Sequence, residues 1–176
     1  MARVTYLDRG DVEVIVQKLV ERLFEDYPDP IRAFQYLGAE GRGLLESALA
    51  LPRQPYYRSV HDKAAVLMRS MIKNHPFLDG NKRAAVASTI VFLIFNNRFL
   101  VSTQDELVQF ALDVARSEPD MDWREISAWI KERTMVLHPL PEENVKRLLA
   151  VQPDVDLLAV RDRVALIMQG LSELMP

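Results

Sequence analysis

The sequence predicts an all-α fold, and three observations carry this prediction. Apolar residues recur at helical spacing along nearly the whole chain, capping signatures precede several of these segments, and segments containing proline and glycine separate them. The length of 176 residues suits one domain with a short extension. We therefore expect a helical core to about residue 135 and a helical extension over residues 136–176.

The first third of the chain is predicted to hold one long and one short helix. An apolar stripe predicts a helix over Val12–Tyr27, with Asp8 and Asp11 as its start signal, and Pro28–Gly43 is expected to be irregular. A short helix is expected over Leu44–Ala50, ended by Pro52. The segment Leu51–Tyr57 contains two prolines and two tyrosines, so it is predicted to be non-helical.

The middle of the chain is predicted to form two buried helices joined by a polar loop. Ser59 and Asp62 resemble a capping box that opens a helix reaching about Asn74. The polar loop spans His75–Asn81, and an apolar helix follows through Ala84–Phe95. This apolar stretch has 12 residues. Because a membrane span needs about 20 apolar residues, we expect a core helix instead.

Further capping signatures and apolar segments follow toward the C-terminus. Thr103 with Glu106, and Asp122 with Glu125, precede amphipathic segments, and Val136–Pro141 is predicted to be a linker. An apolar stripe beyond the linker is expected either to pack on the domain or to form the seam of a homodimer. Its members recur at helical spacing: Leu157, Val160, Val164, Ile167, Leu171 and Leu174.

The composition excludes several classes of function. Lys and Arg total 22 against 25 Asp and Glu, and a net charge of −3 is unlike proteins that bind nucleic acid or anionic membranes non-specifically. We therefore expect neither nucleic acid nor membrane as a partner. An apolar content of 49% excludes a disordered chain. The lack of cysteine excludes disulfides, thiolate zinc sites and cysteine nucleophiles, and with no signal peptide visible it favours a cytoplasmic protein.

The chemically informative segment is HPFLDGNKR, residues 75–83. A connector between helices needs turn residues, but neither a histidine, a carboxylate nor two adjacent cations. Lys82 and Arg83 fall in the first helical turn, where the helix dipole disfavours positive charge unless a phosphate binds there. Asp79 is an oxygen ligand suited to Mg²⁺, and His75 could accept a proton from an attacking hydroxyl. The alternative is a polar turn with a hydrogen-bonded histidine and a solvated Lys–Arg pair.

The other two histidines carry no predicted chemistry. His61 and His138 are expected at the surface or in caps. The three histidines of the chain lack the spacing of zinc ligands, so no zinc site is expected.

The loop resembles the signature of the Fic/Doc (Fido) family, which is His-x-Phe-x-Asp/Glu-Gly-Asn followed by Gly or Lys and then Arg. The segment Gly43–Ala50 is also similar to the one ahead of the target-docking flap in death-on-curing (Doc) proteins, and the resemblance covers residues 4–135. Lys82 in place of a second glycine, and Val86 in place of a later arginine, are typical of the Doc branch, whose members act as kinases. Gly80 is the residue typical of the Fic branch.

The resemblance implies a role for each residue of the loop. His75 would be the general base that deprotonates a Ser, Thr or Tyr hydroxyl of a target protein, and Asp79 would bind the Mg²⁺ that bridges ATP phosphates. Phe77 would be the structural anchor of the loop, and Leu51–Tyr57 would be the flap that aligns the target backbone. Phosphate binding would fall to four consecutive residues: Gly80, Asn81, Lys82 and Arg83.

The resemblance therefore implies a Fido fold over residues 1–135 and a Doc-type toxin. It would transfer the γ-phosphate of ATP to a cytosolic protein, for which a translation factor such as elongation factor Tu is the natural guess. Two alternatives stay open: adenylylation by the same loop, and an idle helical module that binds a partner. An antitoxin acting in trans is expected, because the nearest matches to the internal inhibitory motif of Fic proteins, Ser102–Glu106 and Glu40–Gly41, each lack a required residue.

Overall fold

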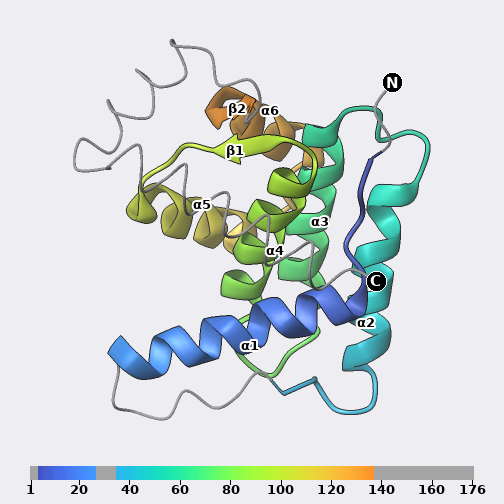
Figure 1. Cartoon of the computed structure of the whole chain (residues 1–176). Helices are drawn as coiled ribbons and strands as arrows, with labels where there is room; N and C mark the ends of the chain where they lie inside the picture. The colour runs from blue at the N-terminus through green and yellow to red at the C-terminus, as the bar shows by residue number, and fades with distance from the viewer. Residues whose placement is uncertain (1–3, 27–34, 137–176) are drawn as a thin grey trace. The chain divides into compact units, whose positions relative to one another are not determined.

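The computed structural model describes residues 4–26 and 35–136, and these residues fold into α-helices with one short β-ribbon (Figure 1). The fold is all-α, as predicted. The helices are α1 (Arg9–Asp26), α2 (Gly41–Ala50), α3 (Val60–Asn74), α4 (Asn81–Phe95), α5 (Gln104–Arg116) and α6 (Trp123–Arg133), with a 3-10 turn η1 (Leu51–Arg53). All of these residues belong to one compact unit, which spans residues 1–137.

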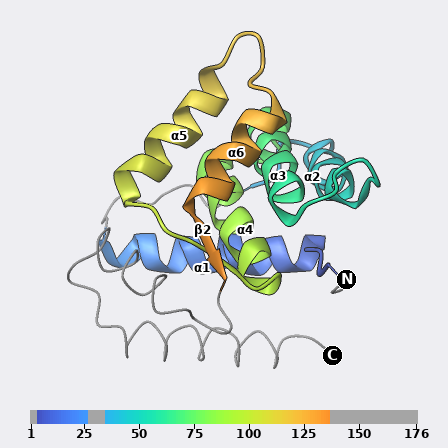
Figure 2. The same ribbon diagram turned by 90° about the horizontal axis from the view of Figure 1, so that it is seen from above.

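Helices α3 and α4 form the centre of the core. Helix α3 packs against α2, η1, α4, α5 and α6, while α4 also contacts α1 and α5 (Figures 1 and 2). Each large apolar side chain buried there stabilises the fold by about 1.5–3 kcal/mol. Fully buried side chains of the three helices α3, α4 and α6 include Leu67, Met71 and Ile72 of α3, Phe92 and Leu93 of α4, and Ile126 and Ile130 of α6.

The helix starts follow the capping signatures. Ser59 and Asp62 form a reciprocal capping box, and the helix that they open ends at Asn74 as predicted. Thr103 and Glu106 form a second box at the start of α5. Asp122 caps α6 by accepting a hydrogen bond from the backbone N–H of Arg124, so this third cap is a simple one.

Several predicted boundaries are corrected. Helix α1 begins at Arg9, directly after the predicted start signal, in which Asp8 and Asp11 accept each other's backbone N–H groups, whereas α2 begins at Gly41 rather than the predicted Leu44. Apolar periodicity detects only the buried part of a helix, so polar or glycine-rich first turns escape it. The segment Leu51–Tyr57 was predicted to be non-helical, but it opens with η1, whose proline lies at a first-turn position where no N–H is needed.

A two-stranded antiparallel ribbon joins distant parts of the chain and was not predicted. Strand β1 (Arg98–Leu100) pairs with β2 (Thr134–Val136), with Phe99 opposite Met135. Strands of three residues are too short to show the period-two pattern that identifies a strand. The predicted linker Val136–Pro141 therefore begins inside β2. Its remaining residues and the C-terminal stripe lie outside the described residues, so the boundary at 135 and the extension stay predictions.

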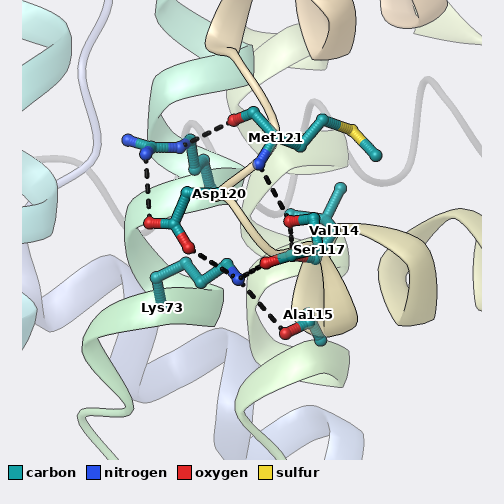
Figure 3. A network of polar contacts seen from close by, with 7 residues as sticks. Lys73, Val114, Ala115, Ser117, Asp120 and Met121 are labelled. Atoms are coloured by element: carbon teal, nitrogen blue, oxygen red, sulfur yellow. Dashed lines mark hydrogen bonds and ion pairs between the residues drawn. The ribbon is translucent and has the colours of Figure 1, made fainter.

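A polar network holds the last turns of α3 against the connection between α5 and α6 (Figure 3). The Lys73 ammonium donates to the backbone carbonyls of Ala115 and Ser117 and pairs with the Asp120 carboxylate at 2.8 Å. Arg69 pairs with the same carboxylate at 3.1 Å and donates to the backbone carbonyl of Met121. The network therefore fixes the end of the helix from which the signature loop departs.

Within residues 4–26 and 35–136, no helix is both long and apolar enough to cross a bilayer.

Candidate active site

His75 lies at the C-cap of α3 in a backbone conformation that glycine normally supplies. Its φ and ψ are 50° and 56°, the left-handed region, and the residue is exposed. Left-handed backbone costs a non-glycine residue about 1–2 kcal/mol, and glycine is the usual residue at this end of a helix. A histidine kept in a strained and exposed position points to a function for its side chain.

The loop after His75 is closed by the side chain of Asn81. The Asn81 carboxamide oxygen accepts from the Phe77 N–H at 2.9 Å, and its NH₂ group donates to the Phe77 carbonyl at 2.7 Å. Both residues are buried, with the Phe77 side chain only 3% exposed in the core. The loop is therefore held in one shape by paired hydrogen bonds and an apolar anchor.

A second support comes from residues 35–37, which sequence analysis left in an irregular segment. The Leu37 N–H donates to the Pro76 carbonyl at 2.9 Å, and the Leu78 N–H donates to the Gln35 carbonyl at 2.8 Å. These bonds form an isolated antiparallel bridge between Tyr36 and Phe77, whose ring centroids lie 5.4 Å apart. No sequence signal identified this pairing, because a bridge has no periodicity.

The start of α2 also approaches the loop closely. A Cβ atom at Gly41 would lie 2.4 Å from the Pro76 carbonyl oxygen, so only glycine fits there without displacing the loop. On the next turn of α2, the Leu44 carbonyl accepts from the Asn74 side chain at 3.2 Å. Of the two residues that flank His75, Asn74 is thereby bonded to α2 and Pro76 lies close against its first residue.

The charged residues of the motif gather at the start of α4. Gly80 is the N-cap, with φ of 79° and no side-chain cap, and Lys82 and Arg83 stand exposed in the first turn. The first-turn N–H groups of a helix have no acceptor within the helix. The Gly80 N–H, by contrast, donates to the Asp79 carboxylate. An anion at this helix start would meet free N–H groups, the positive end of the helix dipole and two cations.

Asp79 is accessible to a ligand. Its side chain is 69% exposed, and its carboxylate lies 3.7 Å from the Arg83 guanidinium, a distance that gives a weak, solvent-screened pair. Within the described ranges, no group of three or more His, Cys, Asp or Glu side chains could hold a metal ion. Mg²⁺ typically uses one or two carboxylates together with substrate phosphates, so a single exposed aspartate beside an anion site fits its chemistry.

The segment predicted to be the flap does not lie beside the loop. Leu51–Tyr57 sits at the N-terminal end of α3, where the Pro52 carbonyl accepts from the Lys63 ammonium, whereas His75 caps the other end (Figure 1). Fifteen residues of helix span about 22 Å. The flap assignment is therefore wrong in position, and residues 35–37 occupy the place beside the loop.

His61 lies outside the candidate site. It is half-buried, and its Nε2 atom is 2.9 Å from the Thr134 hydroxyl. The prediction of a surface or capping position is corrected to a contact between α3 and the start of β2. His138 lies outside the described residues.

A family model and a curated protein relate this chain to the same family. A model described as the Fic/DOC family matches residues 6–93. Toxin Doc from Mycolicibacterium smegmatis is 36% identical over 87 residues, which cover 46% of this chain and 67% of that protein. No solved structure gives a significant match.

The helical fold and the His–Asp–Lys–Arg loop define a transferase of the Fic type. The chain belongs to the Fic/Doc family, and within it to the Doc branch.

Proposed function

We propose that this protein is a Doc-type toxin that uses Mg²⁺ and ATP to phosphorylate a Ser, Thr or Tyr hydroxyl of a cytosolic protein. The observation that carries the proposal is the exposed, left-handed His75 next to the anion-binding start of α4. Asn81 and the bridge to residues 35–37 hold the two in a fixed relation. Phosphoryl transfer depends chiefly on positioning and on charge stabilisation, which such a loop supplies.

His75 acts as the general base. Its neutral imidazole takes the proton of the target hydroxyl while the hydroxyl oxygen bonds to the γ-phosphorus of ATP. The bond from that phosphorus to the bridging oxygen breaks, and ADP leaves with the bonding electron pair. The exposed position of His75 lets a protein segment reach it.

Phosphate binding falls to the first turn of α4. The N–H groups of Asn81, Lys82 and Arg83 and the two cationic side chains face the negative charge of the phosphates. The Asn81 side chain is engaged with Phe77 and the Gly80 N–H with Asp79, so Asn81 would take part in phosphate binding through its backbone N–H. Asp79 is the residue that would hold Mg²⁺, which neutralises phosphate charge when bound.

Lys82 favours phosphoryl over nucleotidyl transfer. A lysine at this position adds bulk and charge at the entrance of the site, where a glycine would admit the phosphate chain deeply. The γ-phosphorus is then brought to His75 in place of the α-phosphorus. Adenylylation by the same loop is the second candidate, because Gly80 is the residue typical of the adenylylating Fic branch.

The biological setting follows from the relationship to a protein named Toxin Doc. We propose a cytoplasmic toxin with a translation factor such as elongation factor Tu as its target, restrained in trans by an antitoxin that contacts Arg83. In support, the Glu106 carboxylate accepts hydrogen bonds from Ser102 and Thr103 at the start of α5. It is therefore held there, whereas an inhibitory glutamate would have to reach Arg83.

Calorimetric titration with MgATP, run beside transfer of labelled phosphate in a cell lysate, tests the proposal. His75→Ala should bind MgATP within a few-fold of wild type and lose transfer by about 10²–10⁴-fold. Asp79→Ala should weaken the Mg²⁺-dependent binding as well. Asp105→Ala, an exposed carboxylate on α5, is the matched control and should change neither. Full transfer by His75→Ala would remove the mechanism, and failure of the wild type to bind MgATP would favour the idle helical module.

A further inference from the structure

We propose that Tyr36 and Glu13 are positioning residues that hold the catalytic loop, and with it His75, in its working place. The inference rests on the proposed role of His75 as the general base. Neither residue belongs to the signature, and both lie in segments that sequence analysis left without a function.

Tyr36 contacts the loop through both its backbone and its ring. It stands opposite Phe77 in the isolated bridge, and the hydrogen bonds on either side join Leu37 to Pro76 and Gln35 to Leu78. The bond to the Pro76 carbonyl holds the peptide group between Pro76 and Phe77, one residue beyond His75. The Tyr36 ring packs on the Phe77 ring at 5.4 Å, so a shift of Tyr36 would carry the loop with it.

Glu13 fixes the far end of the Tyr36 side chain. The Tyr36 hydroxyl donates to the Glu13 carboxylate on α1 at 2.7 Å. Burial, reinforced by this hydrogen bond, raises the pKa of Tyr36 to about 12, so the hydroxyl keeps its proton and remains a donor at every physiological pH.

Glu13 is itself part of a braced group. The Arg9 guanidinium lies 3.6 Å from Glu13 and 3.0 Å from Glu46 of α2, so α1 and α2 are joined at this point. The Arg42 guanidinium stands over the Tyr36 ring at 5.5 Å from its centroid. Tyr36 therefore links the loop to two helices that carry none of the motif residues.

The placement of these contacts favours positioning over overall stability. Glu13 and Arg9 are exposed, and exposed ion pairs contribute little to folding. The buried hydrogen bonds between the Asn81 side chain and Phe77, together with the buried Phe77 ring, already secure the loop to the core. The contacts of Tyr36 with the loop and with Glu13 add a fixed position for the Pro76 peptide. This position matters because displacement of a reacting group by about 1 Å can cost about 10²-fold in rate.

The test compares Tyr36→Phe with Glu13→Gln. Tyr36→Phe keeps the ring and removes the hydroxyl, whereas Glu13→Gln keeps an acceptor for it. Tyr6→Phe is the matched control, because Tyr6 is a partly buried tyrosine whose ring faces Phe92, outside the signature loop. For each protein, kcat, KM for ATP, the melting temperature and amide hydrogen exchange at Leu37 and Leu78 are measured.

Tyr36→Phe should lower kcat about tenfold, the factor expected for loss of one hydrogen bond to a carboxylate, with KM for ATP within twofold of wild type. Amide hydrogen exchange at Leu78 should rise about tenfold in Tyr36→Phe. Glu13→Gln should keep most of the wild-type kcat and most of the wild-type protection of the Leu78 amide. Tyr6→Phe should match wild type. Unchanged kcat in Tyr36→Phe, or unchanged exchange at Leu78, would overturn the inference. Amide hydrogen exchange does not depend on catalysis. It therefore tests whether Tyr36 holds the loop even if the wild type proves to transfer nothing.

Discussion

Asn81 holds both peptide groups of Phe77 with one carboxamide, at 2.9 and 2.7 Å. At the other end of α4, the Asn96 carboxamide makes the same pair of hydrogen bonds with Thr5. It accepts from the Thr5 N–H at 2.9 Å and donates to the Thr5 carbonyl at 2.8 Å. The helix is thus clasped at both ends by asparagine. One clasp shapes the signature loop, and the other secures the N-terminal segment far from it.

Replacement of Asn81 by alanine should therefore impair both folding and transfer. Two buried hydrogen bonds are lost, so we expect the free energy of unfolding to fall by about 2 kcal/mol, with transfer reduced by at least about 10²-fold because the loop loses its shape. Urea unfolding and labelled phosphate transfer measure the two effects. Asn96→Ala is the matched control: it should lose comparable stability and keep its transfer rate. Equal transfer by the two variants would show that the Asn81 clasp has no role in the site.

His75→Gly should separate stability from activity. Glycine adopts the left-handed backbone freely, which relieves about 1–2 kcal/mol of strain, offset in part by the larger entropy of glycine in the unfolded chain. We expect His75→Gly to be at least as stable as wild type while transfer falls by about 10²–10⁴-fold. His75→Ala keeps a Cβ and hence the strain, so it should lose transfer without gaining stability. A melting temperature for His75→Gly below that of His75→Ala would contradict the account of the strained backbone.

Stability should fall as the pH is lowered, in two separate windows. Burial, with the nearby charges of Arg98 and Lys131, lowers the pKa of His61 against the opposing charge of Asp62. The unfolded chain then binds a proton more tightly than the folded chain, so stability is full above about pH 6.5 and declines as the pH falls below it. His61→Gln should flatten the decline between pH 7 and 5 in urea unfolding, and an unaltered slope in this variant would exclude His61 as the cause.

The second window belongs to Asp62. Burial opposes the effect, but hydrogen bonds from Ser59 and Ser127 outweigh it and lower the pKa of this carboxyl. Its stabilising contribution is therefore complete above about pH 4 and is lost as the pH falls further. Asp62→Asn should show less acid sensitivity below that pH, measured by the same unfolding experiment.

Local features of the fold could be predicted from the sequence, and contacts between distant residues could not. The capping box of Ser59 and Asp62 acts within one helical turn, so its residue types reveal it directly. The loop could be recognised because its residues are contiguous. The bridge between Tyr36 and Phe77 joins residues 41 positions apart through backbone atoms, which leaves no pattern in side-chain types.

The error in the flap has the same origin. The flap was placed at Leu51–Tyr57 because Gly43–Ala50 resembles the segment ahead of the flap in Doc proteins, but a helix of 15 residues separates Leu51–Tyr57 from the loop. The hydrogen bonds from the Asn81 side chain to Phe77 could not be predicted either, because the residue type alone does not show which groups the carboxamide contacts.

The central claim, γ-phosphoryl transfer that depends on His75, is tested most directly with ATP labelled at either the α or the γ phosphorus. Wild type and His75→Ala are incubated with each ATP and a cell lysate, and label on protein is counted. With the wild type we expect label only from the γ position, and with His75→Ala we expect none. Lys82→Gly, assayed in the same way, should shift part of the label to the α position. Transfer from the α position by the wild type would contradict the kinase reaction and establish adenylylation in its place.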